Sequence, residues 1–141
     1  MRHVLVLLTL LPFATCQLHS DNSLSLSLPF TSATTNWDTF GSATLHSDTV
    51  VLTPHSPSHL LGALWSKKPN PHQFWEVEFS FRAMGAERGG LGLAFWYAAK
   101  RGIAGNVFGS SDQWDGLGLF FDGNTGGKVE HISTCVNSSR R

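Results

Sequence analysis

The sequence predicts an all-β fold, a β-sandwich or jelly roll. Three aromatic-rich strand patterns separated by glycine-containing loops occupy the centre of the chain, at residues 74–82, 90–98 and 114–122. In the first pattern apolar and polar residues alternate, and this period of two is typical of a half-buried strand. The other two are nearly continuous apolar runs, as in the central strands of a sandwich. Their glycines disfavour a helix, because each would cost about 1 kcal/mol relative to Ala.

Shorter strand patterns precede these three. Alternation of Ser and Leu over residues 23–28 predicts an edge strand, and Trp37 and Phe40 are expected to anchor the core. Three more short strands are predicted, at 43–45, 49–52 and 60–66. Polar and proline-containing turns separate them. Helical periodicity and internal repeats are both missing from the sequence, which favours the sandwich.

Residues 1–16 have the pattern of a secretory signal peptide. A basic start is followed by about ten mostly apolar residues, and Ala14-Thr15-Cys16 supplies the small residues of a cleavage site. The apolar run is too short for a membrane span, which needs about 20 residues; a buried N-terminal strand is the alternative. Cleavage after Cys16 leaves Cys135 alone, either as a free thiol or with its partner in sequence outside this chain.

Composition excludes one class of partner. The 141 residues carry a formal net charge of zero, and only 14% of them are charged. A nucleic-acid-binding domain needs a basic surface, so no nucleic-acid partner is expected. The seven histidines lack the spacing of metal ligands. The length after the signal peptide suits one domain.

Three sequence motifs identify a family resemblance. WEVEFSFR, GLAFWY and VFGSSDQWDGLGLFFD, together with the upstream GALWSKKP, resemble the L-type lectins of the secretory pathway. Those proteins are mannose-binding cargo receptors that cycle between endoplasmic reticulum and Golgi. The resemblance covers about residues 24–128, whereas residues 129–141 form a tail without resemblance to the family. It implies a concanavalin-like jelly roll, of which this chain would hold the N-terminal half.

The same resemblance implies the function and its setting. We expect a carbohydrate-binding lectin that recognises mannose or high-mannose N-glycans on glycoproteins in transport from endoplasmic reticulum to Golgi. Calcium is the cofactor that the family uses. Membrane attachment is expected only through a segment outside this chain, and homo-oligomers only in the full-length form. A chain that is truly truncated would instead be secreted.

Four residues are expected at sites. In the family pattern, Leu91 stands where an Asp accepts hydrogen bonds from sugar hydroxyls, and an aliphatic side chain cannot do so. Asp122 matches the first metal-binding Asp, and Asn124 is a further candidate ligand for metal and sugar. Calcium takes six to eight oxygen ligands, so one carboxylate does not make a site. Asn137 begins an Asn-Ser-Ser glycosylation sequon.

Two alternatives to a working lectin follow from the sequence. A truncated, non-binding fragment of a cargo receptor is the first, because half a sandwich would leave Trp75, Phe79, Phe95 and Phe120 short of packing partners. A jelly-roll glycoside hydrolase is the second. Glu76 and Glu78 lie on one face of the predicted strand, as the two carboxylates of such enzymes can do, although a solvent-facing role is favoured. We therefore expect no enzymatic activity.

Overall fold

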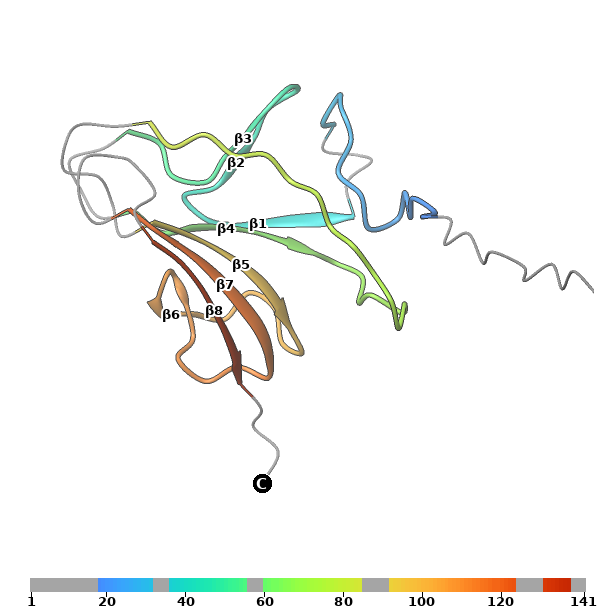
Figure 1. The fold of residues 1–141 in the computed structure, drawn as a ribbon. Coiled ribbons are helices and arrows are strands. Elements are labelled where there is room, and N and C mark those ends of the chain that lie inside the picture. The colour runs from blue at the N-terminus through green and yellow to red at the C-terminus, as the bar shows by residue number, and fades with distance from the viewer. Residues whose placement is uncertain (1–17, 32–35, 56–59, 85–91, 124–130, 138–141) are drawn as a thin grey trace, which may run out of the picture.

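The protein is all-β in the parts of the chain that the structure describes. The computed structural model describes residues 18–31, 36–55, 60–84, 92–123 and 131–137 (Figure 1). The predicted signal peptide lies outside them. The strands are β1 (Trp37–Gly41), β2 (Thr44–Leu45), β3 (Val50–Val51), β4 (Gly62–Ser66), β5 (Gly92–Ala98), β6 (Ala104–Val107), β7 (Gly116–Asp122) and β8 (His131–Asn137). Within the described ranges, no helix has the length and hydropathy of a membrane span.

The largest sheet has the strand order β5–β7–β8 (Figure 1). All its neighbours are antiparallel, with β5 and β7 in register from Gly92 opposite Asp122 to Ala98 opposite Gly116. β8 continues the same ladder, with His131 opposite Asp122 at one end. Two smaller antiparallel pairs, β1–β4 and β2–β3, account for four more strands, and β6 forms only isolated bridges to Ser110. The predicted strands at 43–45, 49–52, 60–66, 90–98 and 114–122 are thereby confirmed, with slightly shorter bounds.

One face of the β5–β7–β8 sheet is packed by aromatic side chains and is called here the closed face. Phe120 lies at its centre and is 9% exposed. The ring of Phe120 contacts those of Trp96 and Phe108, each with centroids 5.2 Å apart, and Trp96 contacts Trp114 at 5.1 Å. Gly118 leaves space for these rings, because a Cβ atom there would be 2.8 Å from Phe120. The expectation that Phe120 lacks packing partners is therefore wrong.

The opposite face of this sheet is called here the open face. Because side chains alternate along a strand, β5 and β7 present to it a second row of large apolar residues. These are Leu93, Phe95, Tyr97, Leu117, Leu119 and Phe121, and β8 adds Ile132, Thr134 and Val136. The open face is only partly covered.

Residues 74–84 run across the open face and are called here the unpaired segment (Figure 1). The Trp75 ring lies 4.7 Å from Tyr97, and the Phe79 ring lies 5.5 Å from Phe95. Phe81 contacts Phe121 at 5.0 Å. The sequence predicts a strand here, but the structure shows an extended chain that belongs to no sheet. Alternation fixes which face a chain buries, whereas a strand also requires a hydrogen-bonded neighbour, and the described residues provide none.

The predicted edge strand at 23–28 is also absent from the structure, which shows a turn there. The Asp21 carboxylate accepts a hydrogen bond from the Ser23 amide at 2.8 Å, and the Asp21 carbonyl accepts from the amides of Leu24 and Ser25. Asp side chains commonly compete with sheet pairing by bonding to nearby amides in this way. The hydrogen bonds to Asp21 therefore hold residues 23–25 in a turn instead of the strand that the Ser/Leu alternation predicts.

The β1–β4 pair is attached to the loop after β5. Asp38 on β1 pairs with Arg101 and with Lys67, the latter at 3.4 Å. Gly102 approaches the ring of Phe40 so closely that a Cβ atom would be 2.7 Å from it. Trp37 and Phe40, the expected core anchors, both belong to β1, and both are half-buried.

Candidate functional site

The candidate sugar site lies at one end of the β5–β7–β8 sheet. The chain enters β5 at Gly92, leaves β7 at Asp122 and enters β8 at His131, and these three residues are neighbours in the ladder. Antiparallel order therefore brings the residues that precede β5 and those that follow β7 to the same end of the sheet. Leu91 and Asn124, the two sugar-site candidates, belong to these connections and lie outside the described residues.

Gly92 is required where the chain enters this end of β5. Its φ is +131°, a backbone conformation that side chains rarely adopt. A Cβ atom on Gly92 would also collide with the backbone oxygen of Phe121 and come within 2.9 Å of the Phe108 ring. The glycine of the second strand pattern thus has a structural reason, since it lets β5 approach β7 closely beside Asp122.

Asp122 lies where the sequence places it, at the last position of β7, and is half-buried. It is a single carboxylate. No group of three or more His, Cys, Asp or Glu side chains suited to a metal ion occurs within the described ranges. Because calcium takes six to eight oxygen ligands, the donors that the structure describes do not fit a calcium ion.

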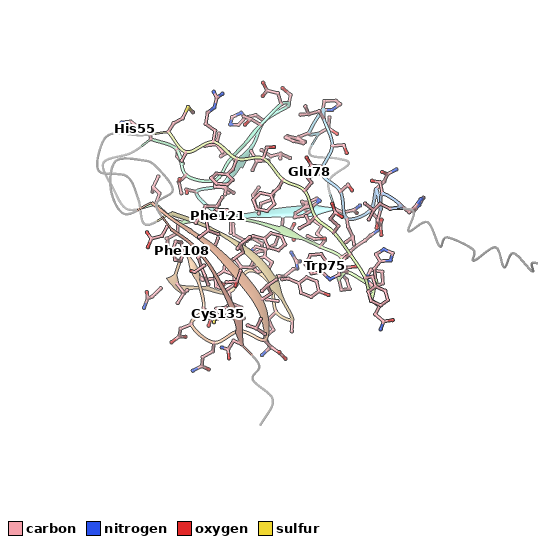
Figure 2. The ribbon with its side chains drawn as sticks, viewed as in Figure 1. His55, Trp75, Glu78, Phe108, Phe121 and Cys135 are labelled. Atoms are coloured by element: carbon pink, nitrogen blue, oxygen red, sulfur yellow. The ribbon has the colours of Figure 1, made fainter. Side chains whose placement is uncertain are left out.

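The other sequence candidates lie away from this end. Asn137 ends β8 opposite Gly116, at the far end of the ladder, and is half-buried. Its role as a glycosylation acceptor stays a prediction. Cys135 is exposed on β8 and forms no disulfide with any described residue (Figure 2). Trp96 packs in the closed face against Trp114 and Phe120.

Glu76 and Glu78 lie in the unpaired segment and are both exposed (Figure 2 labels Glu78). Neither carboxylate forms an ion pair or a hydrogen bond with the described residues. Glycoside hydrolysis places at least one of its two carboxyl groups in a partly buried setting, whereas both of these are exposed. A solvent-facing role explains them.

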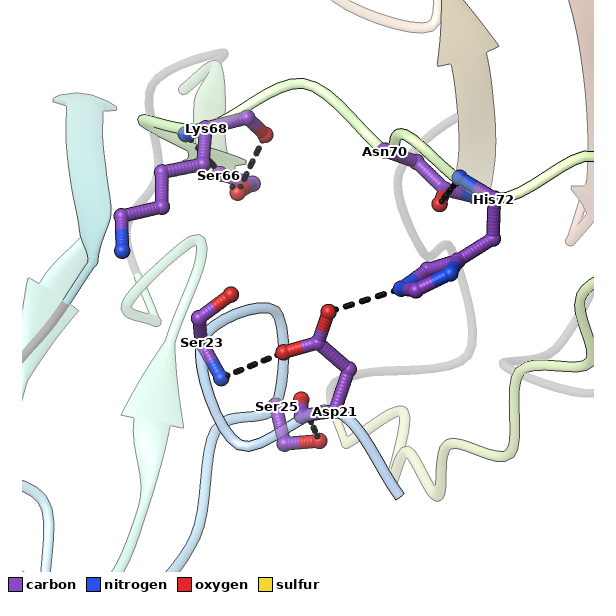
Figure 3. Close-up of polar contacts among 7 residues, drawn as sticks. All are labelled: Asp21, Ser23, Ser25, Ser66, Lys68, Asn70 and His72. Carbon is purple, nitrogen blue, oxygen red and sulfur yellow. Dashed lines mark hydrogen bonds and ion pairs between the residues drawn. The ribbon is translucent and has the colours of Figure 1, made fainter. Parts of the chain in front are cut away.

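A second polar cluster joins the N-terminal turn to the loop after β4 (Figure 3). His72 Nε2 lies 2.8 Å from Asp21 Oδ2, while the His72 amide donates to Asn70 Oδ1 at 2.9 Å. The contact with His72, followed by the hydrogen bonds from Ser23, holds the pKa of the Asp21 carboxyl well below its usual range. A single His–carboxylate pair lacks the ligands of a metal site, so this cluster is a tether between two loops.

One element of the sheet was missed by sequence reasoning. β8 occupies residues that the sequence assigns to a tail, yet it pairs with β7 along the whole ladder. The signal that could have identified it is the β-branched series Ile132, Thr134 and Val136 at a period of two.

Similar proteins point to one family. The profile of the legume-like lectin family matches residues 17–140, a range that includes β8 and extends past the boundary at residue 128. Protein ERGIC-53 of Homo sapiens is 44% identical over 87 residues, which are 61% of this chain and 17% of that protein. VIP36-like protein of Mus musculus is 35% identical over 127 residues, covering 81% of this chain and 36% of the relative.

Solved structures of similar proteins have the same fold as this chain. The exoplasmic/lumenal domain of VIP36 in its Ca²⁺/Man3GlcNAc-bound form is 35% identical with a TM-score of 0.73, covering 83% of this chain and 51% of that domain. Its metal-free form matches with a TM-score of 0.69. The predicted jelly-roll sandwich is thereby confirmed. The chain spans about half of the solved domain and a smaller share of the curated relatives. Because the family profile matches residues 17–140, which is most of the chain, the chain belongs to the legume-like lectin family.

Proposed function

We propose that this protein is a carbohydrate-binding lectin for mannose-containing N-glycans, acting on glycoproteins in transport between endoplasmic reticulum and Golgi. The observation that carries the proposal is the similarity to the VIP36 lumenal domain, which has been solved with Ca²⁺ and Man3GlcNAc bound. The predicted signal peptide supports entry into the secretory pathway. Membrane attachment and oligomer formation are proposed only for a longer, receptor-like form.

The end of the sheet where Gly92 faces Asp122 is the proposed sugar site. Leu91 directly precedes Gly92 in the sequence, at the position where the family's sugar-binding Asp is expected. A hydrogen bond to a charged group contributes about 1.5–3 kcal/mol. We therefore propose weak binding, with affinity about tenfold to a hundredfold below that of a site with a carboxylate at this position.

The described residues at the proposed sugar site do not make up a calcium site. Asp122 is the one carboxylate at this end of the sheet among the described residues, and one carboxylate does not hold a calcium ion. We propose that sugar binding proceeds without strong dependence on calcium. A thermal unfolding midpoint that rises with added calcium chloride but not with magnesium chloride would show that ligands outside the described ranges complete a site.

Titration with Man3GlcNAc, followed by calorimetry or by protein NMR, tests the sugar site. Wild type is expected to bind weakly and Leu91→Asp to bind at least about tenfold more tightly, because the new carboxylate can accept from sugar hydroxyls. Leu91→Ala is the matched control, since it removes the same side chain without adding an acceptor. If neither wild type nor Leu91→Asp binds while both show the same folded spectrum, this function is wrong.

A non-binding fragment is the second candidate, and a specific observation favours it. Large apolar side chains on the open face are exposed, which is unusual for a finished domain and typical of an incomplete one. Absence of glycan binding together with concentration-dependent aggregation would favour this candidate. A hydrolase is not proposed. Incubation with mannan or β-glucan is expected to release no sugar, and release that is lost in Glu78→Gln would contradict this expectation.

A further inference from the structure

The turn that follows β6 contains a residue that its backbone conformation does not suit. Val107 and Ser110 form an antiparallel bridge, and Phe108 and Gly109 between them have φ values of +46° and +82°. Positive φ at both central residues is the pattern of a type I′ turn, in which Asn or Asp followed by Gly is preferred. A bulky side chain in this conformation is strained, because its Cβ atom crowds the backbone. The turn thus explains Gly109 but not Phe108.

The ring of Phe108 lies on the closed face, at the end of the sheet where the sugar site is proposed (Figure 2 labels Phe108). Its centroid is 5.2 Å from that of Phe120 on β7. On β5, a Cβ atom added to Gly92 would be 2.9 Å from Cε1 of the same ring. Gly92 has no side chain, so the edge of the ring occupies the space that a side chain of β5 would fill. A residue outside the sheet therefore bridges β5 and β7 at this end.

Asp122 is placed on the same face as this ring. It follows Phe120 by two residues on β7, and side chains two residues apart on a strand share a face. Its partner in the ladder is Gly92. Side chains at paired positions of adjacent strands have Cβ atoms about 5 Å apart. The Phe108 ring thus takes the place of the cross-strand neighbour that Gly92 does not supply.

Contacts on two sides hold the turn that carries Phe108. Within the hairpin, the Gly105 amide donates to the Gly109 carbonyl at 3.3 Å, and the Ser111 amide donates to the Ile103 carbonyl at 3.1 Å. Beside it, a Cβ atom on Gly109 would be 3.7 Å from the Leu61 side chain, which is ordinary van der Waals contact. A strained residue persists only where its surroundings fix it, and such residues concentrate at functional sites.

We propose that Phe108 is a positioning residue for the sugar site. The inference rests on the proposed function, because it concerns the same end of the sheet. Glycine has more backbone freedom than any other residue, so Gly92 needs an external contact to keep its φ of +131°. The Phe108 ring supplies that contact and holds Gly92 against Asp122. It thereby sets the spacing between the two strand ends that build the site, without touching the sugar itself.

Substitutions at position 108 separate the role of the ring from that of the turn. Phe108→Asn gives the turn a residue that it prefers and removes the ring, so it relieves the backbone strain while it frees Gly92. Phe108→Tyr keeps the ring and is expected to behave as wild type. Phe79→Ala is the matched control for lost aromatic packing, because Phe79 stacks on Phe95 at 5.5 Å on the opposite face of the sheet.

NMR relaxation of the sugar-free protein measures the effect on the backbone. In Phe108→Asn, the order parameter of the Gly92 amide is expected to fall from about 0.85 to below about 0.6. The amides of Ala98 and Gly116, at the other end of the ladder, should keep their wild-type values. Phe108→Tyr and Phe79→Ala should leave Gly92 rigid. An unchanged order parameter for Gly92 in Phe108→Asn would overturn the proposal.

A second variant covers loss of folding at position 108. If circular dichroism shows that Phe108→Asn is unfolded, Phe108→Leu replaces it, because Leu retains apolar bulk but lacks the planar ring. Its expected effect on the order parameter of Gly92 has the same direction and is smaller. A Gly92 amide as rigid in Phe108→Leu as in Phe108→Tyr would then overturn the proposal.

Titration with Man3GlcNAc connects this rigidity to the site. The variants are compared in the Leu91→Asp background, where tighter binding is expected. Adding Phe108→Asn should weaken binding about tenfold, because the site is no longer pre-organised, whereas adding Phe108→Tyr or Phe79→Ala should leave the affinity unchanged. Equal affinity with and without Phe108→Asn would overturn the positioning role alone. No binding by Leu91→Asp itself would overturn the proposed function and the positioning role with it.

Discussion

Replacing Phe120 by Ala is expected to destabilise the β5–β7–β8 sheet more than any equivalent change on its open face. Phe120 is 9% exposed and packs against the rings of Trp96, Phe108 and Trp114. Removing a buried Phe side chain costs about 3–5 kcal/mol, because its transfer free energy is lost and a cavity remains. Rings that contact one another at these distances contribute part of this through their mutual attraction.

Phe79→Ala is the matched control for this prediction. Phe79 also contacts aromatic rings, but it is 41% exposed and therefore buries about two-thirds as much of its surface as Phe120. Scaling the cost with buried surface gives about 2–3 kcal/mol. The expected free energies of unfolding thus differ by about 1–2 kcal/mol between the two variants.

Urea unfolding followed by tryptophan fluorescence and by far-UV circular dichroism measures both changes. Phe120→Ala should lower the midpoint more than Phe79→Ala at an unchanged slope with denaturant. If Phe120→Ala is unfolded without urea while Phe79→Ala is folded, the same ordering holds. Equal losses, or a larger loss for Phe79→Ala, would refute the assignment of the core to the closed face.

The remaining predictions concern the backbone, pH and the thiol. Gly116→Ala is expected to lower the free energy of unfolding by about 2 kcal/mol or more. Gly116 has φ +143°, and an added Cβ atom would collide with the backbone oxygen of Tyr97. A change below about 0.5 kcal/mol in the free energy of unfolding, measured by thermal unfolding, would contradict this. The hydrogen bond from Arg101 lowers the pKa of Asp38. The stabilisation that this ion pair gives the folded state is therefore present above about pH 4 and is lost as the pH falls further. In thermal unfolding, Arg101→Gln should lose less stability than wild type between about pH 6 and about pH 2. Cys135 should react with a maleimide without denaturant, because it is exposed and forms no disulfide with a described residue; mass spectrometry showing no adduct would contradict this prediction.

The sequence predicts the apolar strands β5 and β7 well, misses β1 and β8, and predicts strands at 23–28 and 74–82 that the structure does not form. β5 and β7 are apolar on both faces, as expected of strands that are covered on both sides, and β7 is the central strand of the β5–β7–β8 sheet, with β5 at its edge. Residues 74–84 also have a strong pattern, but the pattern reports burial of one face and carries no information about a hydrogen-bonding neighbour. At residues 23–25 the carboxylate and the backbone carbonyl of Asp21 accept the local amides and form a turn, and a period of two cannot reveal that competition.

The candidate site is predicted to a smaller extent than the fold. Asp122 is correctly placed at the end of a strand, since the apolar run stops there. The role of Leu91 rests on the resemblance to lectins, and neither Leu91 nor Asn124 belongs to the described residues. That Gly92, Asp122 and His131 are neighbours follows from register, which depends on the contacts of whole strands and not on any local motif.

The two glycines with positive φ at the opposite ends of the β5–β7 ladder limit how these two strands can be aligned. Gly92 and Gly116 each lie where a Cβ atom would strike the backbone oxygen of the opposing strand. Sliding one strand past the other by a single residue would bring a side chain into such a position and would also exchange the two faces of the sheet. The alignment of β5 and β7 is thus locked at both ends. Loop residues beyond Gly92 and Asp122 can then change in number and chemistry without shifting the strands, so recognition can diverge while the scaffold stays the same.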